Sequence, residues 1–429
     1  MITFFRKLWR DKRGNAIVIA AAALPLVLGS AGLASDTIQW ALWKRQLARA
    51  ADSAALAGVY SIVEADGDRG NVSTSVDKDL TYNSHIAYTT TKVVGAPTSG
   101  TWATDPFAVQ VAISVQKKLN FSGMFMSFTP TITATSTATV VPSGNYCVIS
   151  LEDQAATGID ATGSTTVNLG CGMITNSPSM SAAVATGSSS VTASPVAAVG
   201  GIPASTHWGS GTVLQPFTLE QADPFASKGV PSYSSCTPFP GNSAGNKPNT
   251  VVNSTTNPEI ANPTGGVKCF SGDIDIQGQV TLDPGIYVIN QGDLGMTNNN
   301  AELHCTGCTF ILTSNGAASD IGTFDLEGGL LDLTSPTSGT YKGITLFQDR
   351  NATADNMNKI NGNSSSKLEG ALYFPRGDLE FTGTSGQNTA CLQIVTKRVQ
   401  FKGNSAVTNT CPAGSGAGSF RGRKVRLVA

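Results

Sequence analysis

Charged side chains and histidines are scarce in this sequence of 429 residues. Asp, Glu, Lys and Arg make up 13% of it, about half of the share that is usual for soluble domains. The formal net charge is −1, so the composition predicts no nucleic-acid partner. The three histidines, His85, His207 and His304, lie in different segments and do not form the cluster that a metal ion would need.

Common catalytic motifs are missing as well. The sequence contains neither the His-Glu-x-x-His zinc motif nor the phosphate-binding Gly-x-x-x-x-Gly-Lys motif. The Asp-x-Ser-x-Ser pattern of metal-dependent adhesion domains is also absent. The sequence therefore predicts no catalytic residues, no cofactor and no metal site, and we expect the protein not to be an enzyme.

Glycine is abundant, at 46 residues, and Ser, Thr and Asn are frequent. This composition suits short strands joined by tight turns. The length predicts two or three domains at roughly 100–200 residues each. We predict an α+β, mostly β protein with an N-terminal transmembrane helix, a small α/β domain and a parallel β-helix-like (solenoid) domain with a long insertion.

The N-terminus carries a membrane-spanning signal. Residues 14–35 contain no charged side chain and are mostly apolar or small, which is long enough for a transmembrane helix. A basic segment at 1–13 precedes it and stays in the cytoplasm by the positive-inside rule. We expect a single-pass protein of the bacterial inner membrane with its body in the periplasm or at the cell surface. A cleavable signal peptide is the alternative. The orienting residues are Arg6, Lys7, Arg10, Lys12 and Arg13.

Residues 36–66 are predicted to continue as a juxtamembrane helix, because alanine, the best helix former, dominates residues 50–57. Trp40, Trp43 and Leu47 recur at helical spacing and form one apolar stripe. The stripe suits two arrangements. Either the helix packs on the domain that follows it, or it packs on partner helices as the stalk of a pilin does.

These N-terminal residues carry a family resemblance. The string Arg-Asp-Lys-Arg-Gly-Asn-Ala at 10–16, the apolar helix and the string Ala-Ala-Asp-Ser-Ala-Ala-Leu-Ala at 50–57 resemble TadG-like (TadE/TadG) proteins of Flp, or tight-adherence, pilus-assembly systems. The resemblance implies a membrane-anchored component with pilus-assembly or pilin-like proteins as partners. In pilin-like members a prepilin peptidase cuts after a Gly such as Gly14, and a Glu follows at the fifth mature position. Ile19 occupies that position here, which favours an uncut anchor.

Residues 67–146 predict the small α/β domain. The patterns indicate a helix at 76–88 and strands at 107–115 and 132–141. The first of these strands alternates apolar residues so that one face is apolar. That face consists of Phe107, Val109, Val111, Ile113 and Val115.

Residues 147–429 repeat short apolar or β-branched stretches between Gly, Asn and Ser turns, for example at 286–289, 309–312 and 330–333. This repetition predicts a solenoid whose coils stack on one another. A β-sandwich is the alternative. Residues 202–266 lack strand periodicity and are predicted to be an insertion that docks on the coils, and the basic stretch 421–427 to be a capping edge strand. The docking residues are Trp208, Phe217 and Phe225.

The eight cysteines all lie beyond Tyr146. An even number in an exported chain indicates disulfides formed in an oxidising compartment, with buried free thiols as the alternative. Cys305 and Cys308 form Cys-Thr-Gly-Cys before a strand, which favours a turn-closing disulfide over a redox or zinc site. Residues one coil apart come within disulfide range. This gives the candidate pairs Cys147–Cys171, Cys236–Cys269 and Cys391–Cys411.

Two functions follow. The first is a non-catalytic structural component of a Flp pilus assembly or a related surface-attachment machine, with membrane lipid and pilus-assembly proteins as partners. The second is an envelope β-helix protein that binds or cleaves polysaccharide, with surface glycan as the partner. It would use paired carboxylates, although isolated Asp in Gly-rich turns more often bonds nearby backbone. The candidate carboxylates are Asp273, Asp275, Asp293, Asp320, Asp325, Asp332 and Asp349.

Overall fold

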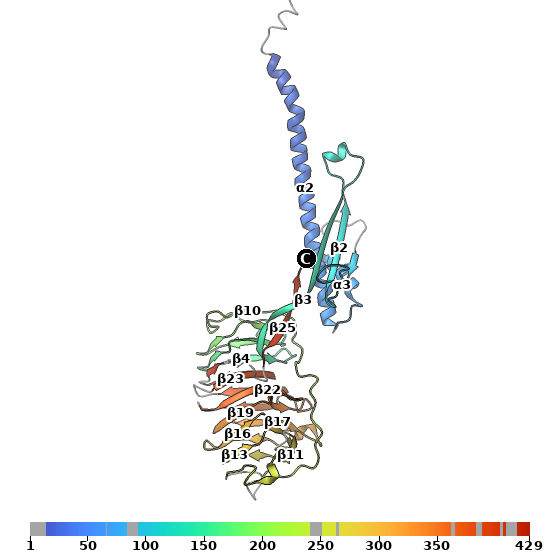
Figure 1. Cartoon of the computed structure of the whole chain (residues 1–429). Coiled ribbons are helices and arrows are strands. Elements are labelled where there is room, and N and C mark those ends of the chain that lie inside the picture. Colours follow the sequence, from blue (N-terminus) through green and yellow to red (C-terminus); the bar gives the residue numbers. More distant parts are fainter. Residues whose placement is uncertain are drawn as a thin grey trace, which may run out of the picture. The chain divides into compact units, whose positions relative to one another are not determined.

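The computed structural model describes residues 14–65, 67–83, 93–240, 251–262, 266–361, 365–382, 388–403, 406–408 and 418–429. The fold is mostly β, with one long apolar helix at the N-terminus and many parallel strand pairs (Figure 1). The chain forms two compact units. The first comprises Met1–Val141 and Lys424–Ala429, and the second comprises Pro142–Arg423.

The first unit is built on the helix α2 (Gly14–Glu64), which runs through the predicted span and the predicted juxtamembrane segment without a break. In its C-terminal half, Leu47, Ala51 and Ala55 are fully buried on one face. The alanine-rich string predicted to be helical therefore also forms core. The helix α3 (Val72–Asn83) packs against this face and begins before the predicted position 76.

An antiparallel sheet completes the core of the first unit. It contains β1 (Val93–Gly95), β2 (Val109–Gln116) and the first part of β3 (Thr131–Ser150). The alternation predicted for β2 is confirmed, because Val109, Val111, Ile113 and Val115 are buried in the same cluster as the face of α2. The short helix η1 (Ser122–Met124) lies in the connection between β2 and β3.

The end of the chain belongs to the first unit. The stretch 421–427 is a strand, as predicted, within β25 (Phe420–Leu427). Its predicted role as a cap of the solenoid is wrong for its last residues, because Lys424–Ala429 cluster with the first unit. There Val425 and Leu427 pack on the core that α2 and β2 share. The Val428 N–H donates a 2.8 Å hydrogen bond to the Thr137 carbonyl.

The second unit contains three ladders of parallel strands. The first ladder crosses the whole unit. Its order is β11 (Val267–Ser271), β14 (Gly285–Asn290), β17 (Cys308–Thr313), β20 (Ile344–Gln348), β22 (Lys367–Thr382), β23 (Asn388–Lys402), β3, β6 (Gly172–Thr175), β9 (Val196–Ala198) and β10 (Leu214–Gln215).

The other two ladders follow the same course. The second has the order β12 (Ile274–Asp275), β15 (Leu294–Gly295), β18 (Phe324–Leu326), β21 (Met357–Ile360), β22, β23, β4 (Ile159–Ala161) and β7 (Ala183–Ala185). The third runs from β13 (Gln279–Leu282) through β16 (Glu302–Thr306) and β19 (Leu330–Thr334) to β22 and β23. A separate sheet pairs β24 (Ala406–Thr408), β5 (Thr166–Asn168) and β8 (Ser190–Thr192).

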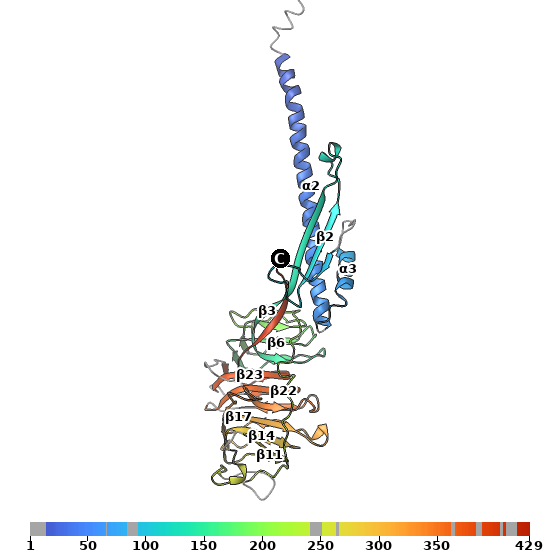
Figure 2. The ribbon, with the colours of Figure 1, turned by 45° about the vertical axis from the view of Figure 1, so that its right-hand side comes forward.

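The order of the ladders differs from the order of the chain. β23, near the C-terminus, pairs with β3 and β4, the first strands of this unit, through Ile394↔Val148 and Val399↔Ile159. Figure 2 shows β23 between β22 and β6. The N-terminal strands of this unit therefore extend the ladders that its C-terminal strands begin. The sequence predicts repeated short strands from 147 and, after the insertion, from 267, but it does not predict this junction.

The space between the ladders is filled by apolar side chains, including a row in which Tyr287 stacks on Phe270 and Phe310 at 6.3 and 5.7 Å. The predicted insertion begins later than residue 202, because β10 still extends the first ladder. Phe225 packs edge-on against Tyr373 at 5.4 Å. The predicted docking of Phe217 is wrong, since its side chain is 63% exposed. Short helices η2 (Pro258–Ile260) and η3 (Ala318–Asp320) lie in connections.

Candidate functional site

The N-terminal half of α2 is an apolar surface. The helix is long and apolar enough to cross a membrane, and its most apolar window is not buried at all. In this half, apolar side chains are exposed on all sides of the helix, whereas a surface helix of a globular protein buries one stripe. This fits a membrane-anchored protein. The predicted orienting residues Arg6, Lys7, Arg10, Lys12 and Arg13 lie outside the described residues. The exposed set is Val18, Ile19, Leu24, Leu26, Val27, Leu28, Leu33, Ile38 and Leu42.

The predicted stripe of Trp40, Trp43 and Leu47 runs from this surface into the core. Trp40 is 39% exposed, Trp43 is half-buried and Leu47 is fully buried. Lys44 Nζ lies 5.2 Å from the Trp40 ring, and Lys117 Nζ lies 5.1 Å from the Trp43 ring. Leu47 therefore packs on the domain that follows, which was the first of the two predicted arrangements for this part of the helix.

The connection between β2 and β3 carries a feature that the sequence analysis missed. Its backbone is fixed to α2 by Asp36, whose carboxylate accepts hydrogen bonds from the Phe121 N–H at 2.8 Å and the Ser122 N–H at 2.5 Å. Beyond this point, Met124 and Phe125 are 78% and 77% exposed. The signal in the sequence is a group of five large apolar residues within 121–128, between the predicted strands at 107–115 and 132–141.

Disulfides join three of the candidate cysteine pairs. Cys147 of β3 and Cys171, which directly precedes the neighbouring strand β6, are joined with a Cα–Cα distance of 5.9 Å. Cys236 binds Cys269, which fastens the insertion to β11. Cys391 is also disulfide-bonded, and its predicted partner Cys411 lies outside the described residues.

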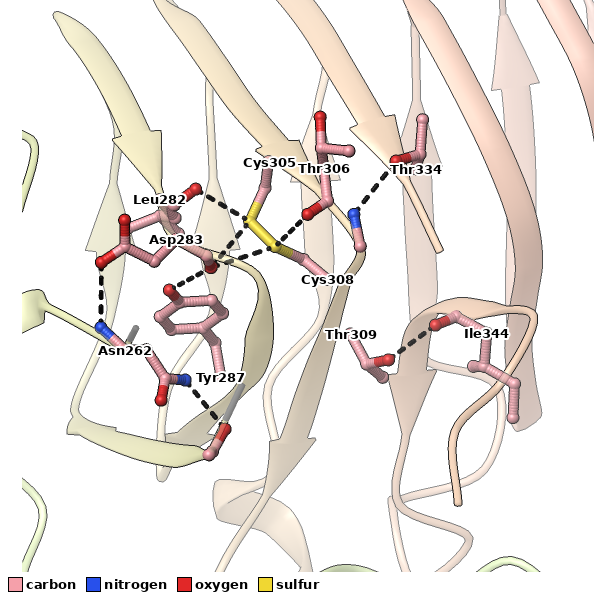
Figure 3. Close-up of a disulfide and its surroundings, with 12 residues drawn as sticks. Asn262, Leu282, Asp283, Tyr287, Cys305, Thr306, Cys308, Thr309, Thr334 and Ile344 are labelled. Atoms are coloured by element: carbon pink, nitrogen blue, oxygen red, sulfur yellow. Dashed lines mark hydrogen bonds between the residues drawn. A yellow bond between two sulfur atoms is a disulfide. The ribbon is translucent and has the colours of Figure 1, made fainter. Parts of the chain in front are cut away.

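The third described pair, Cys305–Cys308, closes the turn between β16 and β17 (Figure 3). Gly307, inside this turn, has φ +76°, a conformation that favours glycine. The Cys308 sulfur lies 3.4 Å from the Asp283 carbonyl oxygen. A redox pair would have its cysteines at a helix N-terminus, whereas these lie between strands. No cluster of three metal-ligating side chains occurs among the described residues.

A charged cluster lies at the junction of the two halves of the stack. Arg398 of β23 is hydrogen-bonded to Glu152, which follows β3 and is fully buried. The same guanidinium lies 3.4 Å from Asp378 and 2.9 Å from Asp355, and Lys397 Nζ is 2.6 Å from Asp355. Burial lowers the pKa of Arg398, but the bond to Glu152 and the nearby carboxylates outweigh it and raise that pKa. This arrangement stabilises the charged guanidinium.

The pKa values of two other carboxylates in this cluster, Asp355 and Asp378, shift in opposite directions. The hydrogen bond from Lys397 lowers the pKa of Asp355. Burial raises the pKa of Asp378, although Arg398 partly offsets this. None of these residues could be predicted from the sequence, because Glu152 and Arg398 are far apart in the chain and carry no motif.

A polar groove of about 620 Å³ follows the second ladder. Asp273, Asp293 and Asp320 line it. Asp273 accepts a hydrogen bond from the Asp293 N–H at 3.0 Å, and Asp293 accepts one from the Thr323 N–H at 2.5 Å. Asp320 accepts the Ala317 N–H at 3.3 Å. These carboxylates therefore fasten turns, as isolated Asp residues commonly do.

The other candidate carboxylates also have neighbours within the fold. Asp349 accepts a hydrogen bond from the Thr313 hydroxyl at 2.7 Å, and Asp275 accepts one from the Gln277 amide at 3.0 Å. Asp332 lies 3.6 Å from His304. Burial and the nearby Glu327 raise the pKa of Asp325.

The remaining candidates for chemistry are dispersed. His304 contacts Glu302 at 3.1 Å, and His207 contacts the Ser189 carbonyl at 3.1 Å. His85 lies outside the described residues. The sequence also contains Gly-Asn-Ser-Ala-Gly at 241–245, which has the Gly-x-Ser-x-Gly spacing of a nucleophile elbow, so the expectation that common catalytic motifs are missing is wrong for this motif. These five residues lie outside the described residues as well.

Comparison with known proteins gives one match. The family model described as "Putative Flp pilus-assembly TadE/G-like" matches residues 14–61. The matched segment lies within α2 and covers the apolar surface and the start of the alanine face. The TadG-like resemblance of the N-terminal residues is confirmed for this segment. No curated protein and no solved structure matches the chain.

Proposed function

We propose that this protein is a non-catalytic structural component of a Flp, or tight-adherence, pilus assembly or a related surface-attachment machine. The observation that carries the proposal is the family match over residues 14–61, which coincides with the exposed apolar helix. In this proposal α2 spans the bacterial inner membrane with its N-terminus in the cytoplasm. The β body then lies in the periplasm or at the cell surface and works through binding and adhesion.

The properties of α2 support an anchor. The first half of the helix exposes apolar side chains, while the second half buries Leu47, Ala51 and Ala55 within its own unit. A helix divided in this way holds a folded domain close to a bilayer. The described disulfides also support export, because such bonds form in oxidising compartments.

We further propose that the second unit is a β-helix-like solenoid. Three parallel ladders enclose an apolar interior, and successive coils bury their apolar faces on each other. Continuous parallel pairing and a shared apolar interior hold the strands of such a body in fixed positions. This suits a scaffold or an adhesive body better than an enzyme that must close over a substrate.

A second candidate function is polysaccharide binding at the groove that Asp273, Asp293 and Asp320 line. The polar lining and the open course along the ladder favour it. The hydrogen bonds of these carboxylates to backbone N–H groups favour binding over cleavage, because a general acid must be free to exchange its proton.

The test is deletion of the gene, followed by electron microscopy of pili and a surface-attachment assay. We expect the deletion to abolish piliation or attachment and the full chain to restore it. A chain with Leu24→Arg and Leu26→Arg should not restore it, because each Arg costs about 2.5–3.5 kcal/mol at the centre of a membrane helix.

The matched control is Leu24→Ala with Leu26→Ala, which keeps the span apolar and should restore function. Normal pili and normal attachment in the deletion strain would overturn the proposal. Polysaccharide binding by the purified full chain, lost in Asp293→Asn, would instead support the second candidate.

A further inference from the structure

The connection between β2 and β3 exposes an unusual number of large apolar side chains. We define the hairpin tip as residues 121–128. Within it, Met124, Phe125, Met126 and Phe128 are 78%, 77%, 47% and 62% exposed. Apolar surface exposed to water is unfavourable, so a cluster of this kind marks an interaction surface.

The hairpin tip is held beside α2 at one level of the helix. Asp36 accepts hydrogen bonds from the backbone N–H groups of Phe121 and Ser122. The Phe121 ring lies so close to Gly32 that a Cβ there would be 2.3 Å from the ring. Figure 1 shows the hairpin, with η1 at its end, running alongside α2. The tip is therefore level with residues 32–36.

This level coincides with the end of the apolar span. Residues 14–35 of α2 extend about 33 Å at 1.5 Å per residue, and the hydrocarbon core of a bilayer is about 30 Å thick. Residues 32–36 then lie where the helix leaves the acyl chains, on the side of the folded domain. The hairpin tip lies at the same depth.

The residues around the hairpin tip fit a membrane interface. Trp40 and Trp43 follow on α2, and Lys44 and Lys117 lie over their rings. The Lys118 side chain packs beside Gly123 of the tip. Aromatic residues at the headgroup level and lysines beside an inserted apolar group are typical of interfacial segments.

We propose that the hairpin tip inserts into the acyl–headgroup boundary of the bilayer that α2 spans, with phospholipid as its partner. The inference rests on the proposed anchoring by α2. Phospholipid is the occupant because the tip continues the apolar surface of the span at the same level and has lysines for lipid phosphates. The two contacts together fix the rotation of the first unit on the membrane.

The test uses the full chain in nanodiscs of phosphatidylethanolamine and phosphatidylglycerol. The photoreactive residue p-benzoylphenylalanine replaces Phe125, Val27 or Tyr82 in separate variants, and lipid adducts are measured by mass spectrometry. Val27 reports the span, and Tyr82, on α3 and 74% exposed, is the matched exposed aromatic control. We expect a lipid adduct yield at 125 similar to that at 27 and at least roughly tenfold above that at 82.

A lipid adduct at 27 with a yield at 125 no higher than at 82 would overturn insertion of the tip and leave the anchor intact. Absence of lipid adducts at both 27 and 125 would overturn the anchor as well. In native membranes, a protein adduct at 125 in place of the lipid adduct would assign the hairpin tip to a partner protein and overturn the proposal.

Discussion

Arg398 lies where strands from the two ends of the second unit meet, and its guanidinium neutralises a fully buried carboxylate. Glu152 has no exposed surface, and its charge is tolerated because Arg398 donates a hydrogen bond to it. Removal of one partner of a buried pair leaves the other charge without compensation. Loss of Arg398 should therefore destabilise the fold more than loss of a surface ion pair on β23.

We expect Arg398→Met to lower the free energy of unfolding by about 3–5 kcal/mol. The measurement is urea unfolding of the full chain in detergent, followed by circular dichroism. The matched control is Lys402→Met. Lys402 is also on β23, and its partly exposed ion pair with Glu380 of β22 should contribute about 1 kcal/mol or less. Equal effects of the two substitutions would show that Arg398 is an ordinary surface partner.

At the scale of elements, the sequence predicted most strands and few of their partners. The stretches 286–289, 309–312 and 330–333 lie within β14, β17 and β19. Local alternation and turns determine where a strand forms. The pairing of β23 with β3 depends on contacts between distant residues, as does the ion pair of Arg398 with Glu152. Neither leaves a local signal in the sequence.

The hairpin tip was missed for a different reason. Apolar residues at 121–128 have no helical or strand period, so their meaning depends on where the connection lies relative to α2. Disulfides were easier to predict, because the paired cysteines are close in sequence as well as in space, at separations of 24, 33 and 3 residues.

The disulfides differ in the length of chain that they close. Cys147 and Cys171 are 24 residues apart, whereas Cys305 and Cys308 are 3 apart. In the chain-entropy description the longer loop contributes about 2 kcal/mol more stability. We expect Cys147→Ala with Cys171→Ala to lower the unfolding free energy more than Cys305→Ala with Cys308→Ala. Urea unfolding of both double variants checks this, and a larger loss from the Cys305–Cys308 variant would contradict it.

At the scale of the whole molecule, the second unit is one stack made from two segments of chain that meet end to end. The connection from β10 to β11 passes outside the ladders, and Phe225 within it packs on Tyr373. None of the described disulfides links a cysteine before Phe225 in the sequence to one after it. Cys147–Cys171 precedes Phe225, and Cys236–Cys269 and Cys305–Cys308 follow it. Parallel pairing of β23 with β3 and β4, and the Arg398–Glu152 pair, therefore hold the two segments together without a covalent bond among the described cysteines.

Cleavage of the connection tests this arrangement directly. A protease site inserted after Ala222, which is exposed, divides the chain into fragments carrying α2 to β10 and β11 to β25, and leaves Phe225 on the same fragment as its partner Tyr373. We expect the cleaved fragments to elute as one 1:1 complex in size-exclusion chromatography with light scattering. Because Lys424–Ala429 belong to the first unit, the same experiment on a chain ending at Arg423 removes their contribution and leaves the strand pairing within the second unit. Separation of the fragments in that shorter chain would mean that the pairing of β23 with β3 and β4 does not join the two segments, whereas continued association would show that the stack is a single folded body.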